Sequence, residues 1–415
     1  MISRENKIDF SILFSFEGIG LLLMFLTLPV VSRIYDPVDF GDFEKYVVFV
    51  GVVGNIFLLN FEFKIYDYVT KKEQTVSLLS CLFLIGLFSF LFLSLSSLSI
   101  HYIPNKLFSS YHIIILIFLW LLFVSLANMT LSYFSSAGNF KRYSIVRLLS
   151  NIVLITCQII CGLLSFKFYG FLYAIILQNV CISIFGVIPV YNLIRTYYKD
   201  ISIKDVLSQL TKNKNILMYT FPGSLLNRLT QSLPVYFLAT FNPVHLGYYA
   251  FGSQLLNHPL KLFNGLGNMF KKEFNDEIRK DKIFEKSFRK YSKIFAGVSV
   301  SLLLGVFLLS DLLVPLIFGD SWNGVVPILK ILVLHVSLRY VAAGLSPVLL
   351  IGNLPKYDIF FQCFYLIMAA VSIYVAKQIF NTSMSVIYSY AVSSVIFYIC
   401  YFILMKYFSN KTIHR

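Results

Sequence analysis

Three basic side chains lie near the middle of long apolar segments of the chain. They are Arg228, Lys261 and Arg339, and no acidic residue stands at an obviously matching depth in these segments. Ionisable groups within a hydrocarbon layer usually face a cavity and mark a pathway. Arginine pairs with phosphate through two parallel hydrogen bonds, and such bonds strengthen away from bulk water. These residues therefore predict a site for an anionic group.

Amides, prolines and glycines accompany these cations. Asn227, Gln231 and Asn257, within the apolar segments 216–241 and 248–270, are further candidates for substrate binding. Proline and glycine bend or interrupt a membrane helix, and the freed backbone groups must be satisfied by protein or water. We expect both segments to line a pathway; the alternative is two bent helices packed through small and amide residues.

Further ionisable residues lie closer to the ends of their segments. Arg147, Glu62, Lys330 and Asp311 are expected to reach an interface or to pair with one another, although Arg147 stays a candidate for substrate binding. The candidates for coupling or gating are Glu17, Glu62 and His335. An interior, hydrogen-bonded histidine is the alternative interpretation of His335.

The composition is that of a membrane protein. Apolar residues make up 58% of the chain and charged residues 13%, and the mean hydropathy is +0.76. Continuous apolar runs long enough to cross a bilayer, without the alternation of barrel strands, predict helices. We expect twelve spans, at 10–34, 46–66, 76–98, 113–133, 143–165, 169–191, 216–241, 248–270, 294–318, 325–351, 357–379 and 384–408.

The distribution of lysine and arginine predicts the orientation. With the N-terminus inside, the inner segments carry 25 of these residues and the outer loops carry three. This asymmetry follows the positive-inside rule and places both termini in the cytoplasm. The net charge of +15 is then explained by anionic membrane lipids at the inner leaflet, without nucleic acid. The six cysteines fall within predicted spans and form no metal-binding pattern, so we expect no metal and no cofactor.

An eight-residue phrase occurs twice, as DPVDFGDF from Asp36 and as NPVHLGYY from Asn242. In each copy the first residue suits an N-cap, the proline suits the first helical position, and the glycine permits close helix contact. The phrase therefore predicts a turn that starts a helix at equivalent places in two halves. We expect a six-helix lobe at 1–191, a cytoplasmic linker at 192–215 and a second six-helix lobe at 216–415, an architecture typical of transporters.

Several segments resemble Wzx-type polysaccharide flippases of the MOP superfamily. The resemblance rests on RIYDPVDFGDF at 33–43, YFSSAGNFKRYS at 133–144, FGDSW at 318–322 and the block from Phe221 to Gly265. It implies an all-α membrane protein of twelve transmembrane helices, in two six-helix bundles around a central cavity (a MATE-like fold). It also implies movement of an undecaprenyl-pyrophosphate-linked oligosaccharide, such as an O-antigen or capsule unit, from the cytoplasmic to the periplasmic leaflet of the bacterial inner membrane. Proton or sodium coupling and contact with polysaccharide polymerase machinery would fit this family.

Two other functions remain open at this point. A cation-coupled drug or metabolite exporter of the same fold usually needs an acidic cavity, whereas the predicted site is basic. The acidic cluster Asp36, Asp39, Asp42 and Glu44 could indicate a membrane glycosyltransferase or polymerase. The second copy of the phrase keeps the proline and the glycine but lacks the acidic residues. This favours a structural role for the phrase and a protein that is not an enzyme.

Overall fold

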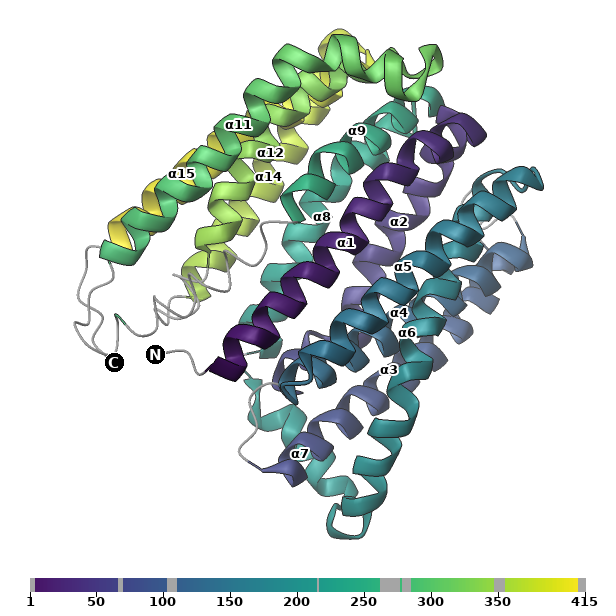
Figure 1. Ribbon diagram of the computed structural model, residues 1–415, viewed down its shortest axis with the longest axis vertical. Coiled ribbons are helices and arrows are strands. Elements are labelled where there is room, and N and C mark those ends of the chain that lie inside the picture. The colour runs from purple at the N-terminus through teal and green to yellow at the C-terminus, as the bar shows by residue number, and fades with distance from the viewer. Residues whose placement is uncertain are drawn as a thin grey trace. The chain divides into compact units, whose positions relative to one another are not determined.

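The computed structural model describes residues 4–65, 70–102, 110–214, 216–261, 277, 285–346 and 355–409, and the regular structure within these ranges is helical (Figure 1). The long helices are α1 (Arg4–Ile34), α2 (Pro37–Leu58), α3 (Lys71–Tyr102), α4 (Tyr111–Ser136), α5 (Phe140–Leu163), α6 (Phe168–Tyr197), α8 (Phe221–Leu238), α9 (Pro243–Lys261), α11 (Glu285–Phe318), α12 (Val325–Leu345), α14 (Pro355–Phe380) and α15 (Ser383–Ser409). Short helical turns are η1 (Phe61–Ile65), η3 (Tyr198–Asp200), η4 (Ile216–Thr220) and η5 (Asp320–Trp322), and α7 (Ile203–Lys212) is a short helix.

Eight helices within the described residues are long and apolar enough to cross a membrane, namely α3, α4, α5, α6, α11, α12, α14 and α15. The all-helical membrane class predicted from composition is therefore confirmed. The predicted span at 216–241 begins with the π-helical turn η4, which leads into α8. The predicted span at 248–270 begins earlier, at Pro243, and its residues beyond Lys261 lie outside the described part of the chain.

Contacts divide the chain into two compact units. Unit 1 comprises residues 1–27 and 46–225, and unit 2 comprises residues 28–45 and 226–415. In unit 1, α6 packs against α4 and α5, and α3 packs against α4. The turn η1 closes one end of this packing, because Phe61 and Ile65 are buried against Leu78 and Cys81 of α3.

Helix α7 lies in the segment 192–215 and packs on α3 within unit 1. Its N-terminus is a capping box: the Ser202 hydroxyl accepts a hydrogen bond from the Asp205 N–H, and the Asp205 carboxylate accepts one from the Ser202 N–H. The bond from the Ser202 backbone, above all, holds the pKa of Asp205 below its usual value. The Gln209 amide donates to the Ser77 hydroxyl at 3.1 Å and ties α7 to α3.

Unit 2 is organised around α12. This helix contacts α9, α11 and α15, and α14 packs against α15; α11, α12, α14 and α15 lie side by side in Figure 1. In the most apolar 18-residue stretch of each helix, 67% of the α12 residues are buried, whereas only 11% of the α11 residues are buried. Leu308 and Leu316 of α11 are 75% and 69% exposed, as expected for side chains that face lipid. Most of α12 is therefore enclosed by other helices of the unit.

The two copies of the repeated phrase meet within unit 2. Helices α2 and α9 begin at Pro37 and Pro243, which confirms the predicted starts, and the Asn242 side chain accepts from the Val244 N–H at 2.9 Å. A Cβ atom on Gly41 would come within 2.5 Å of the Pro243 carbonyl oxygen, and one on Gly247 would overlap the Pro37 carbonyl. The close helix contact predicted from the glycines is confirmed.

The FGDSW segment, residues 318–322, packs against α2 and α9 near their contact. Gly319 has φ +93°, a conformation that favours glycine, and it leads into η5 with the fully buried Trp322. The Trp322 ring packs against Phe40 of α2 and Phe251 of α9, with centroids 5.1 Å and 4.1 Å away. Its indole N–H donates to the Ser32 carbonyl at 2.9 Å, so the only polar atom of the side chain is satisfied.

Candidate functional site

Arg339 lies on α12 in the interior of unit 2. Its side chain is half-buried, and its guanidinium donates to the Gln231 side-chain oxygen at 3.4 Å and to the Asn257 side-chain oxygen. Gln231 comes from α8 and Asn257 from α9, so three helices meet at one cation. Three of the residues predicted for substrate binding are thus brought together.

The two amides are held in fixed orientations by their own helices. The Asn257 amide nitrogen donates to the Ser253 carbonyl at 2.7 Å, which turns its oxygen toward Arg339. The Gln231 amide nitrogen donates to the oxygen of Asn227, a fourth predicted residue, at 2.8 Å and one turn earlier on α8. We call Asn227, Gln231, Asn257 and Arg339 the amide–arginine network.

The network leaves the charge of Arg339 uncompensated. Both of its acceptors are neutral, and no carboxylate in the described part of the chain forms a salt bridge with Arg339. A guanidinium has five N–H donors, so donors remain after these two bonds. A cation positioned by neutral dipoles in an apolar interior can bind an anion through hydrogen bonds and charge together.

Three tyrosines lie within electrostatic range of this cation. Arg339 acts electrostatically on Tyr249 of α9 and on Tyr390 and Tyr398 of α15. His335, one turn before Arg339, is buried and packs edge-on against Tyr390, with centroids 5.2 Å apart. His335 thus lies one helical turn from Arg339 of the network. The tyrosines carry no signal in the sequence, because 27 tyrosines are scattered through it.

The other predicted cations have different positions. Arg228 is exposed on α8 and directly follows Asn227. Because successive side chains of a helix leave its axis about 100° apart, the two side chains point in different directions. Arg147 belongs to unit 1, is exposed, and lies over the Tyr143 ring with 5.7 Å to the centroid. Lys261 is the last described residue of α9, and its side chain lies outside the described residues.

Glu17 and Glu62, the acidic candidates for coupling or gating, lie in unit 1. Glu62 is half-buried in η1 and acts electrostatically on Cys81. The side chain of Glu17, on α1, is outside the described residues. Lys330 and Asp311 form the ion pair expected of them, with 2.5 Å between nitrogen and oxygen. In the described residues no three histidine, cysteine or acidic side chains gather as a metal site would require.

Comparison with known proteins assigns the family. The model of the family described as "Polysaccharide biosynthesis protein" matches residues 30–327. The chain belongs to this family. A protein described as "Uncharacterized membrane protein in cps region" of Klebsiella pneumoniae is 21% identical over 342 residues, which cover 80% of this chain and 68% of that protein.

Two solved structures have a similar fold. "Lipid II flippase MurJ, inward closed conformation" aligns with a TM-score of 0.63 at 16% identity, over 96% of this chain and 87% of that one. The inward-facing structure of a multidrug resistance MATE family transporter aligns with a TM-score of 0.58 at 13% identity, over 95% and 93%. The resemblance to Wzx-type proteins is confirmed, and so is the MATE-like and MurJ-like MOP fold. The chain is therefore a membrane protein of the polysaccharide biosynthesis family with this fold.

Proposed function

We propose that the protein is a flippase for a lipid-linked oligosaccharide, and that Arg339 recognises the pyrophosphate of this substrate. The observation that carries the proposal is the uncompensated guanidinium, held between Gln231 and Asn257 inside a membrane protein of the polysaccharide biosynthesis family. The Klebsiella relative encoded in a cps region and the fold shared with a lipid II flippase support the same substrate class.

The amides explain how one site can hold and release its ligand. In the absence of ligand the amide oxygens stabilise the guanidinium, which is costly to leave unpaired in an apolar surrounding. A pyrophosphate would take up the remaining N–H donors and supply the missing negative charge. Because the amides are neutral, they do not compete with it as a carboxylate would.

The proposal includes twelve transmembrane helices in two six-helix bundles around a central cavity, with both termini in the cytoplasm of a bacterium. The substrate would be an undecaprenyl-pyrophosphate-linked O-antigen, capsule or similar repeat unit, moved by alternating access. Outward movement of each negative charge from a negative interior is favoured by about 2.3 kcal/mol per 100 mV. Arg228, Lys261 and Arg147 are proposed as further substrate contacts, and Glu17, Glu62 and His335 as coupling or gating residues.

The test compares two cations on the same helix. In a strain that depends on this protein for surface glycan, Arg339→Ala should reduce export by about tenfold or more, since hydrogen bonds to charged groups contribute about 1.5–3 kcal/mol. Lys330→Ala is the matched control, because Lys330 is already paired with Asp311. Arg339→Lys should restore part of the export. Full export by Arg339→Ala at normal protein level would refute the site, and drug efflux without glycan export would favour the exporter function instead.

A further inference from the structure

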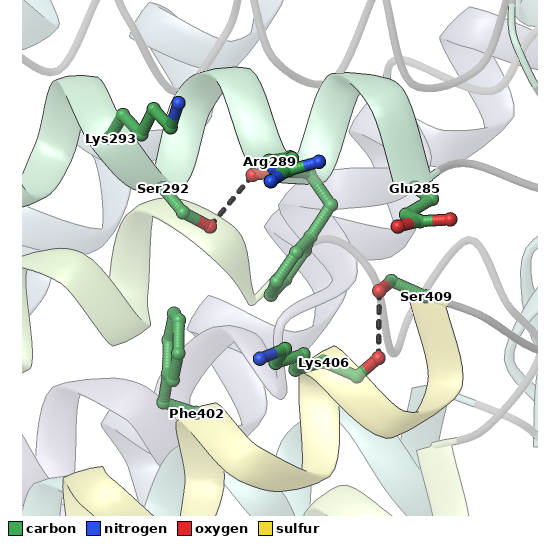
Figure 2. A pocket seen from close by; sticks show the side chains of 8 residues that line it. Glu285, Arg289, Ser292, Lys293, Phe402, Lys406 and Ser409 are labelled. Carbon is green, nitrogen blue, oxygen red and sulfur yellow. Dashed lines mark hydrogen bonds between the residues drawn. The ribbon is translucent and has the colours of Figure 1, made fainter.

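A second basic site lies at one end of unit 2, between the start of α11 and the end of α15. This pocket has a volume of about 360 Å³ and is lined by Glu285, Phe288, Arg289, Ser292, Lys293, Phe402, Lys406 and Ser409. Figure 2 shows the Phe402 side chain pointing from α15 toward α11, and the Lys406 nitrogen lying between the two helices. None of these residues belongs to the amide–arginine network.

The pocket combines an apolar floor with a surplus of positive charge. Phe288 and Phe402 pack against each other, with ring centroids 5.8 Å apart. Three cations and one carboxylate line the pocket, and within the described residues neither Arg289, Lys293 nor Lys406 forms a salt bridge. Ser292 and Ser409 donate to carbonyls of their own helices, so the cations are the available donors.

The positive character comes from side chains rather than from the helix terminus. The Glu277 carboxylate already accepts the backbone N–H groups of Lys286 and Ser287, at 3.1 Å and 2.9 Å. These bonds satisfy first-turn donors of α11 that an anion could otherwise use. An anion in the pocket must therefore be bound by the arginine and the two lysines.

Lipid-facing surface adjoins the pocket on both helices. Ile294, next to Lys293, is 37% exposed, and Ile403, three residues before Lys406, is 59% exposed. Tyr407 is 54% exposed and follows Lys406 directly, as is typical of an aromatic residue at a membrane interface. Acyl chains can thus lie along α11 and α15 while a headgroup occupies the pocket.

We propose that this pocket binds the phosphate headgroup of an anionic glycerophospholipid of the surrounding membrane. Basic pockets between transmembrane helices at the cytoplasmic side bind such headgroups, and the lysine distribution predicts the cytoplasmic side for this end. The volume is at the lower end of the roughly 300–1,000 Å³ of small-molecule sites. It suits a phosphate with a small alcohol and is too small for an oligosaccharide, so the site is distinct from the proposed transport site.

The test uses the purified protein, and lipid binding is measured first without any transport substrate. The pocket variant carries Arg289→Gln, Lys293→Gln and Lys406→Gln together. The control variant carries Arg195→Gln, Lys199→Gln and Lys204→Gln, which remove the same charge from exposed residues of unit 1. Native mass spectrometry counts bound phosphatidylglycerol, and thermal unfolding is followed as phosphatidylglycerol or phosphatidylcholine is added.

The pocket variant should bind phosphatidylglycerol at least about tenfold more weakly, since a hydrogen bond between charged groups in the pocket contributes about tenfold or more. The control variant should bind as the unchanged protein does, and phosphatidylcholine should have little effect on any of them. If the pocket variant is poorly folded, Lys406→Gln alone should still weaken binding, because Lys406 is exposed.

Three results would overturn the proposal. The first is equal phosphatidylglycerol binding by the pocket variant and the unchanged protein. The second is an equal loss in the control variant, which would mean that total charge alone matters. The third is competition at concentrations where phosphatidylglycerol binds. If inorganic phosphate raises the unfolding temperature as phosphatidylglycerol does, the pocket is a site for a free anion. If a polyprenyl pyrophosphate displaces bound phosphatidylglycerol, the pocket belongs to the transport substrate.

Discussion

Gly41 and Gly247 face each other where α2 and α9 cross, and neither position has room for a Cβ atom. The two glycines occupy the same place in the repeated phrase, 206 residues apart. The repeat in the sequence is therefore a contact in the structure, in which the start of each helix packs on the start of its counterpart.

Replacing either glycine by alanine should destabilise the protein. The added methyl group would meet backbone atoms of the partner helix, and overpacking costs about 1–3 kcal/mol. Gly305→Ala is the control: among the described residues no atom lies within 4 Å of the place that its Cβ would take, and alanine favours a helix over glycine by about 1 kcal/mol. Thermal unfolding in detergent should thus move down for Gly41→Ala and Gly247→Ala, and stay or rise for Gly305→Ala. The same shift in all three would contradict the contact.

The packing of the Trp322 ring should contribute more to the stability of the protein than the hydrogen bond of its N–H. Trp322→Phe keeps an aromatic ring against Phe40 and Phe251 but leaves the Ser32 carbonyl unpaired, which costs about 1–3 kcal/mol. Trp322→Ala also removes the buried ring and should cost about 3–5 kcal/mol. Thermal unfolding of the two variants ranks these contributions, and a larger loss in Trp322→Phe would contradict the packing described.

Asn257 allows the charge of the network to be changed without removing Arg339. Asn257→Asp places a carboxylate where the amide oxygen accepts from Arg339, so the guanidinium would be neutralised. Protein abundance should stay near normal, while glycan export falls by about tenfold or more because an anion must compete with the new ion pair. Asn257→Ala should impair export less. Export by Asn257→Asp at or above that of Asn257→Ala would contradict the role of free positive charge.

The N-terminal cap of α7 should lose its stabilising effect at acid pH. The pKa of Asp205 is lower in the folded protein than in the unfolded chain, so its contribution is fully present above the unfolded pKa and is lost as the pH falls through the folded pKa. Hydrogen exchange corrected for intrinsic rates should show α7 losing protection below about pH 4. Asp205→Asn should remove this pH dependence, and an unchanged dependence in that variant would contradict the assignment.

The sequence predicts the membrane class and much of the site because polar residues are conspicuous in apolar runs. Asn227, Gln231, Asn257 and Arg339 stand out for this reason, and the repeated phrase predicts where α2 and α9 begin. Side-chain direction is harder to predict, since a helix that is apolar on all sides has little periodicity. The exposure of Arg228 and the tyrosines near Arg339 therefore emerge only in the structure, as does α7 within the segment 192–215.

The most direct test of the account measures flipping itself. Purified protein in liposomes is given a fluorescent polyprenyl-pyrophosphate oligosaccharide, and the rate at which the label crosses the bilayer is recorded. We predict that Lys330→Ala flips the lipid at the rate of the unchanged protein, whereas Arg339→Ala is slower by about tenfold or more. An Arg339→Ala protein that flips the lipid at the unchanged rate would contradict the central claim that this guanidinium recognises the pyrophosphate.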